Sequence, residues 1–225
     1  MKLMIEKIPE LLEASIITVQ LTFFSLAVGI FLGLFFAVLR LSKNKILSGI
    51  SYYYSFVFRG TPLLVQLFII YFGLAQLEFV RESFLWIVLK KPFWCAIIAF
   101  ALNTGAYTAE IFRSGFEKVD KQLIDAAKSL GMSKYNTFYK IILPIGLKRS
   151  IPAYGNEMIL MLKGTSLAST VTLIDLTGAA KYIISTHFNP VEVFIFTGSI
   201  YLFFTFIIHH FIKYLEMKTD YIYKT

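Results

Sequence analysis

Long apolar stretches separated by short charged segments dominate the sequence. Five runs can be followed along the chain: 14–39, 46–77 with Arg59 inside it, 92–112, a weaker run from about Ser150 that contains Glu157 and Lys163, and 193–212. Because a helix needs about 20 apolar residues to cross a bilayer core, we expect an all-α, polytopic membrane protein with about five transmembrane helices. The first run is too long for the apolar part of a cleaved signal peptide, so it should remain as the first span.

Glycine and proline positions shape the first two runs. A continuous helix over 46–77 would be about 48 Å long at 1.5 Å per residue, which exceeds the bilayer core. Thr61 is suited to cap a new helix and Pro62 to occupy its first position, so a break is expected at Gly60-Thr61-Pro62. In the first run, Gly29 and Gly33 form a small-x3-small pattern, which favours close helix packing.

The composition supports a membrane location for the whole chain. Hydrophobic residues make up 57% of it and charged residues 16%, whereas soluble domains average about 25% charged residues. The 225 residues suffice for one transmembrane domain, residues 1–225, and leave no room for a second sizeable one.

The net charge of +8 is distributed in a way that indicates membrane topology rather than nucleic-acid binding. If the odd-numbered spans run inward, fourteen Lys and Arg lie in 40–45, 113–149 and 213–224, and six lie in 2–7, 81–91 and at Lys181. Because cytoplasmic loops carry an excess of Lys and Arg, we expect the N-terminus outside and the C-terminus in the cytoplasm.

The longest charged segment, residues 113–149, is expected to be structured. Asp120 can cap a short helix that ends before Gly131, which turns the chain. Ser133 can cap a second helix that should stop before Pro144. The two expected helices are 120–130 and 133–142. Two short amphipathic helices on the cytoplasmic side would form a docking surface for a partner protein.

The residues of this segment follow a recognisable spacing. Asp125-Ala126-Ala127 are followed after three residues by Gly131, after nine more by Ile141, and after one more by Leu143-Pro144. The spacing resembles the EAA loop of permease subunits in binding-protein-dependent ABC importers, E-A-A-x3-G-x9-I-x-L-P, with Asp125 in place of Glu. Segments 18–22, 59–66 and 163–167 are similar to the polar amino acid branch of these permeases.

The resemblance implies a multi-pass subunit of the prokaryotic cytoplasmic membrane that imports a polar amino acid by alternating access. It also implies three kinds of partner: a second permease chain, like or unlike, an extracytoplasmic amino acid binding protein, and two ATPase subunits that bind ATP and Mg. The ATPase-docking residues would be Asp125, Ala126, Ala127, Gly131, Leu143 and Pro144. The sequence contains no Gly-x4-Gly-Lys-Ser/Thr motif, so nucleotide hydrolysis should occur on another polypeptide. We also expect no catalytic residue, cofactor or metal on this chain.

Polar residues within the expected spans are candidates for a substrate pathway, because charges at membrane depth are costly and usually functional. A carboxylate could be held by Arg59, Thr61, Lys163, Thr165 and Ser166, and an ammonium or basic side chain by Asn103, Glu110, Asn156 and Glu157. Two acids at depth favour a cationic amino acid such as arginine, lysine or histidine. Arg59 and Lys163 each precede Gly-Thr, which suggests two helix interruptions at similar depth.

Each charged candidate also has a structural interpretation. Glu110 and Arg113 are spaced to pair on one helix face. Arg59 can extend its side chain to the interface. Lys163 and Glu157 can pair with each other or across a subunit interface.

Two other functions remain open at this stage. A secondary amino acid transporter would also have polar residues at depth, but five spans without an obvious inverted repeat argue against it. A membrane enzyme would need a clustered nucleophile, base or metal set, and the sequence offers no convincing one.

Overall fold

The computed structural model describes residues 2–221, and the side chains of residues 6–219. Within this part of the chain the helices are α1 (Lys2–Arg40), α2 (Lys45–Gly60), α3 (Leu63–Phe68), α4 (Glu78–Arg81), α5 (Trp86–Leu89), α6 (Pro92–Glu117), α7 (Lys121–Ser129), α8 (Lys134–Thr137), α9 (Leu143–Gly164), α10 (Leu176–His187) and α11 (Pro190–Tyr221). The described residues contain no strand, and the expected all-α class is confirmed. Lys224 and the side chain of Lys2, which enter the charge comparison, lie outside the described part.

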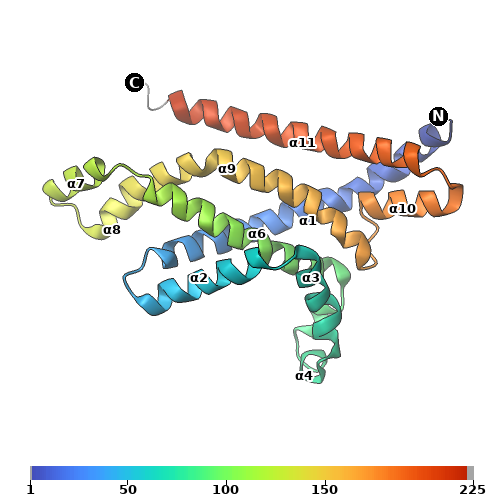
Figure 1. Ribbon diagram of the computed structural model, residues 1–225, viewed down its shortest axis with the longest axis horizontal. Coiled ribbons are helices and arrows are strands. Elements are labelled where there is room, and N and C mark those ends of the chain that lie inside the picture. The colour runs from blue at the N-terminus through green and yellow to red at the C-terminus, as the bar shows by residue number, and fades with distance from the viewer. Residues whose placement is uncertain (1, 222–225) are drawn as a thin grey trace.

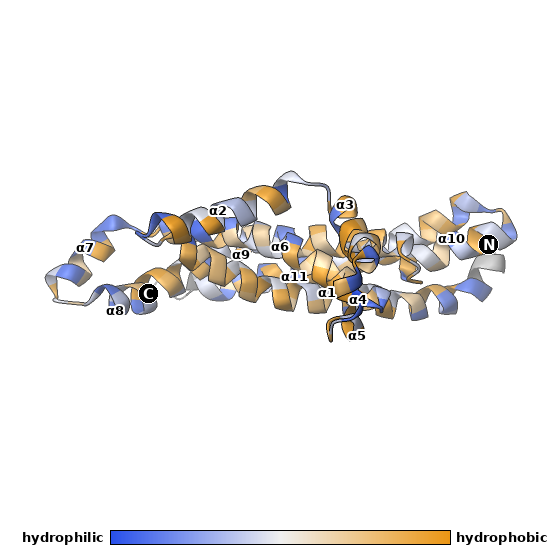
Figure 2. Ribbon diagram, turned by 90° about the horizontal axis from the view of Figure 1, so that it is seen from below, coloured by the Kyte–Doolittle hydropathy of each residue, from blue (hydrophilic) through white to orange (hydrophobic). Residues whose placement is uncertain are grey.

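The long helices run side by side along one axis. Figure 1 shows α1, α6, α9 and α11 along the length of the molecule, with α2 beside α6. Helices α7 and α8 lie at one end, called here the α7 end, and α10 lies at the other, the α10 end. The segment from α3 to α5 leaves the bundle at a steep angle. In Figure 2 hydrophobic residues extend along the bundle, and hydrophilic ones are frequent in α7 and α8.

Three described helices are long and apolar enough to cross a membrane: Glu6–Arg40, Pro92–Glu117 and Pro190–Thr219. The bent pair Lys45–Gly60 and Leu63–Gln76 would be a fourth span if it is counted as one. Helix α9 carries more charge, but it packs against α6, α1 and α11 within the bundle. It begins at Leu143, earlier than the expected start near Ser150, because Pro144 fits the first turn of a helix.

The expected break in the second run is confirmed. Helix α2 ends at Gly60, and the chain bends by 102° before α3 begins at Leu63. The expected cap was wrong by one position, because Pro62 rather than Thr61 precedes α3 and provides no side-chain hydrogen bond. The Thr61 hydroxyl instead donates to the Val57 carbonyl, 2.8 Å away, and so closes the end of α2.

The connection from α8 to α9 differs from the expectation. Ser133 caps α8 as expected, but the helix does not stop before Pro144. It continues through a π-helical turn, Phe138–Ile142, directly into α9. A proline ring clashes with the carbonyl four residues earlier in an α-helix, and the wider π turn just before Pro144 provides room for it.

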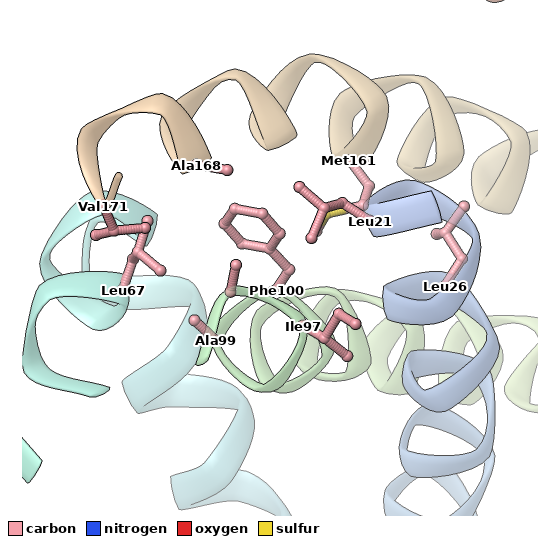
Figure 3. Packing of buried hydrophobic residues seen from close by; sticks show 10 residues of the cluster. Leu21, Leu26, Leu67, Ile97, Ala99, Phe100, Met161, Ala168 and Val171 are labelled. Atoms are coloured by element: carbon pink, nitrogen blue, oxygen red, sulfur yellow. The ribbon is translucent and has the colours of Figure 1, made fainter. Parts of the chain in front are cut away.

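One apolar cluster joins the helices near the α2–α3 break. Phe100 of α6 is fully buried at its centre (Figure 3). Its neighbours in the cluster come from α1, α3, α9 and the 3₁₀ turn Thr165–Thr170: Leu21, Leu26, Leu67, Met161 and Ala168. These contacts fix α6 as the central helix, on which the polar residues described below are mounted.

The glycine pattern in α1 is used for close packing, as expected. A Cβ atom at Gly29 would collide with the Thr104 side chain, and one at Gly33 would lie 2.5 Å from Thr108 Cβ and 3.2 Å from Ala109 N. Helices α1 and α6 therefore approach each other at positions where only hydrogen fits on the α1 side.

Replacing Gly33 with alanine is expected to lower the stability of the protein. Overpacking of this kind typically costs about 1–3 kcal/mol. Gly198→Ala is the matched control, because nothing lies within 4 Å of a Cβ atom there and alanine favours a helix over glycine. Thermal unfolding of both variants in detergent measures the difference. Equal melting temperatures for Gly33→Ala and the wild-type protein would contradict the packing described here.

Candidate functional site

Polar residues form a stripe along one face of α6. Asn103, Tyr107, Glu110, Ser114 and Lys118 follow one another at steps of four, three, four and four residues, and this spacing returns to the same helix face. Four of them, all except Asn103, line a pocket of about 270 Å³ that also contacts Arg59, Arg149 and Ala153. We call these five residues the polar stripe. It leads from the α2–α3 break toward the α7 end.

Arg59 and Glu110 meet at this pocket. The Arg59 guanidinium lies 5.4 Å from the ring centre of Tyr107, and its Nη1 is 4.0 Å from Glu110 Oε2. The same Glu110 oxygen accepts a hydrogen bond from Arg113 Nε at 2.8 Å, so the expected pair on one helix face is present. A positive and a negative group are thus presented together, and the Arg59 side chain remains 43% exposed.

Glu157 is a buried carboxylate on α9. Only 5% of its surface is exposed, and its Oε1 accepts a hydrogen bond from the Thr104 hydroxyl at 2.7 Å. None of the ion pairs found among the described residues includes Glu157. The alternative of a Glu157–Lys163 pair within one chain is therefore not observed, and Lys163 is exposed.

The α2–α3 break brings Thr61 and Asn103 together through Gln66. Asn103 Nδ2 donates to the Phe58 carbonyl at 2.9 Å and to Gln66 Oε1 at 3.0 Å. Gln66 Nε2 in turn lies 2.7 Å from Thr61 Oγ1 and 3.0 Å from the Thr61 carbonyl. Gln66 was not among the expected site residues, although a glutamine four positions after a proline in an apolar run was a visible signal.

Four other candidates lie away from the polar stripe and from the α2–α3 break. Asn156 lines a separate pocket of about 380 Å³ between α9 and α11. Lys163 is exposed near the end of α9. Thr165 is fully buried and donates to the Leu162 carbonyl, and the Ser166 hydroxyl donates to the Lys163 carbonyl.

The two expected helix interruptions do occur, and they are neighbours. The α-helical part of α9 ends at Gly164 and continues as a 3₁₀ turn, and α2 ends at Gly60. A Cβ atom at Gly164 would lie 3.2 Å from Leu63 Cδ2. The two interruptions therefore lie close together, whereas the short sequence similarity around Arg59 and Lys163 had suggested only that they occur at similar depth.

The α7 helix carries an apolar face with no partner among the described residues. Leu123, Ala126 and Leu130 are spaced at three and four residues and are all exposed, Leu130 by 83%. Ala127 faces the other way and is 3% exposed, where α7 packs against α8 and the π turn. Of the two expected docking alanines, only Ala126 is therefore accessible. The leucines were missed, although their helical spacing was available in the sequence.

The end of α7 has the expected form. Asp120 caps the helix by accepting from the Gln122 amide at 2.9 Å. Gly131 has a φ angle of +75°, and its amide donates to the Lys128 carbonyl while that of Met132 donates to Ala127. This paired arrangement is a Schellman motif, for which glycine is the favoured residue.

The other expected docking residues have local partners. Asp125 is exposed and its Oδ1 lies 2.7 Å from Lys128 Nζ. Leu143 packs beneath the loop against Ala37, Phe112 and Phe116, and Pro144 occupies the first turn of α9. These last two residues attach the loop to the bundle.

Comparison with known proteins decides the family. Residues 29–221 match the family described as Binding-protein-dependent transport system inner membrane component. The chain belongs to this family. The expected family membership is confirmed, and so is the expected function as a membrane permease subunit of an ABC importer.

Relatives of this permease are similar along nearly its whole length. The nopaline transport system permease protein NocM of Agrobacterium fabrum is 48% identical and covers 96% of this chain and 90% of its own. The arginine ABC transporter permease protein ArtM of Haemophilus influenzae is 38% identical, covering 88% and 87%. A crystal structure of an amino acid ABC transporter has a TM-score of 0.85 at 35% identity and covers 96% of both chains. A chain of the MetNI methionine ABC transporter, 14% identical with a TM-score of 0.70, shares the fold.

Proposed function

We propose that this permease imports a basic amino acid and that the polar stripe lines its path. The observation that carries the proposal is Glu157, a buried carboxylate whose described partner is a neutral hydroxyl. A carboxylate at membrane depth that forms no salt bridge among the described residues favours a ligand of opposite charge. The relatives support this choice, because their names refer to nopaline, octopine, arginine, and histidine with lysine and ornithine.

Arg59 and Glu110 suit the two ends of an amino acid. The Arg59 guanidinium is exposed to the pocket and can hold a carboxylate. Glu110 and Glu157 can attract the ammonium and the basic side chain. Asn103 donates both amide hydrogens to protein atoms and does not line the pocket, so it would act on the substrate indirectly.

The remaining pathway candidates would act outside the pocket at which Arg59 and Glu110 meet. Asn156 and Lys163 are exposed on α9, and we propose that they face the second permease chain. Thr165 and Ser166 can donate to a carboxylate only after they release the carbonyls of Leu162 and Lys163. Thr61 shares its hydroxyl with Gln66 and Val57 at the break.

We further propose that residues 1–225 form one transmembrane domain, with the α7 end in the cytoplasm and the N-terminus outside. Two ATPase subunits, which bind ATP and Mg, would dock on the exposed face of α7. A binding protein would deliver substrate to the outer segments 78–92 and 168–191. Closure of the ATPase pair would draw the two docking loops together and open the pathway outward.

Uptake by the complete importer should be inhibited by arginine, lysine or histidine and hardly by glutamate or aspartate. The reason is that Glu110 and Glu157 attract a cation and repel a second carboxylate. Competition assays in proteoliposomes, with each amino acid in excess over a labelled basic substrate, measure the preference. A preference for the acidic amino acids would overturn the proposal. Uptake that proceeds without ATP would favour a secondary transporter instead.

A further inference from the structure

The α2–α3 break leaves backbone carbonyls that the helix no longer pairs. In a membrane such groups need partners from the protein, because lipid provides none. The Val57 carbonyl is used by the amide and hydroxyl of Thr61. The carbonyls of Phe58 and Thr61 are instead reached by side chains from α3 and α6. The bend therefore depends on side chains outside α2.

Gln66 and Asn103 satisfy these carbonyls as one unit. Gln66 Nε2 donates to Phe58 O at 2.8 Å and to Thr61, while Asn103 Nδ2 donates to Phe58 O at 2.9 Å. The 3.0 Å hydrogen bond from Asn103 to Gln66 Oε1 joins the two amides. Their exposures are 6% and 7%, so water hardly competes for these bonds.

The unit connects the break to α6, the central helix of the bundle. Asn103 follows Phe100, the centre of the apolar cluster, by less than one turn of α6. Phe58, the residue held by both amides, directly precedes Arg59. The Arg59 guanidinium is directed at Tyr107 and Glu110, which lie one and two turns farther along the same face of α6.

We propose that Gln66 and Asn103 form a clamp that holds the α2–α3 bend and thereby positions Arg59 at the substrate pocket. In this role both are positioning residues, acting on the substrate through Arg59. The proposal rests on the proposed function for the role of Arg59 in transport, but the geometry of the bend can be tested without substrate. Tyr54 offers a matched control, because its hydroxyl also joins α2 to α6, donating to the Leu102 carbonyl at 2.7 Å, without reaching the break.

The first test measures the bend in the assembled importer in lipid nanodiscs. Spin labels at Tyr53 on α2 and Phe79 on α4, which are 67% and 71% exposed, report the distance across the break. Gln66→Met keeps the side-chain length and removes both donors and the acceptor. We expect it to shift or broaden the distance distribution, whereas Tyr54→Phe leaves it unchanged. Gln66→Glu, which retains only the acceptor for Asn103, gives the same test if Gln66→Met does not assemble.

The second test measures the connection to Arg59 by uptake. Gln66→Met and Arg59→Gln should each reduce uptake by about tenfold, the scale expected for loss of a buried hydrogen-bonded group. Uptake by the double variant should be no lower than uptake by the more impaired of the two single variants, because both changes remove the same positioned group. Tyr54→Phe should stay within about threefold of wild type.

Two outcomes would overturn the clamp. An unchanged distance in both Gln66 variants would show that the bend does not need it, and multiplied effects in the double variant would show that Arg59 does not depend on it. A shifted distance together with uptake that is insensitive to Arg59→Gln would leave the bend explained and reject the role of Arg59 in the proposed function.

Discussion

Replacing Ala126 with arginine is expected to weaken association of the ATPase subunits by about tenfold or more. Ala126 lies between the exposed Leu123 and Leu130 on the face of α7 that has no partner among the described residues. A bulky charge there would overpack a fitted groove and bury an unpaired cation. Pull-down of the ATPase with wild-type and variant permease, alongside ATP-driven uptake, measures the effect.

Two control variants separate docking from folding of the loop. Ala126→Ser changes the volume little and should dock normally. Gly131→Val should also impair docking, because a β-branched residue is strained at a φ of +75°, whereas Gly131→Asn should be tolerated. Normal ATPase binding and uptake in both Ala126→Arg and Gly131→Val would contradict the docking role of α7.

Replacing Glu157 with glutamine is expected to reduce uptake of a basic amino acid by about tenfold to a hundredfold. Hydrogen bonds to a charged group contribute about 1.5–3 kcal/mol, and a glutamine oxygen can still accept from Thr104 while it carries no charge. Assembly with the ATPase should be unaffected, since Glu157 lies far along α9 from α7. Initial uptake rates in proteoliposomes, normalised to assembled importer, provide the measurement.

The contacts around the two acids supply the controls for this experiment. Thr104→Val removes the hydroxyl that bonds to Glu157 but leaves the charge, so its effect should be smaller. Glu110→Gln should impair uptake, whereas Glu117→Gln, which removes an exposed partner of Arg113, should not. Unchanged uptake in both Glu157→Gln and Glu110→Gln would assign these acids to structural pairing.

The spans and the helix ends of the 113–149 segment could be predicted because their signals are local. Apolar length marks a membrane helix, Asp120 and Ser133 mark helix starts, and Gly131 marks a turn that needs positive φ. The helix stop before Pro144 was predicted wrongly for a physical reason. A proline forbids a regular α-helix around it, but a π turn just before it satisfies the same constraint.

The candidate site could be predicted only in part, because it depends on which helix faces meet. Arg59, Thr61, Asn103 and Glu110 share one region, whereas Asn156 turns toward α11 although it is adjacent to Glu157. Adjacent residues on a helix point in directions about 100° apart, so the sequence alone could not assign both to one pocket. The spacing of the polar stripe on α6 is visible in the sequence. The residues of α2 and α9 that face it could be identified only from the structure.

The π turn between α8 and α9 also determines how force can pass through the protein. The chain remains helical from Lys134 to Gly164, a path of roughly 46 Å at 1.5 Å per residue, with the π turn and Pro152 inside it. Glu157 lies on this helical path, and a Cβ atom at its far end, Gly164, would lie 3.2 Å from Leu63 Cδ2 at the bend. A movement of α7 imposed by a partner would therefore pass, through its contacts with α8 and the π turn, into a continuous helix that leads to the bend.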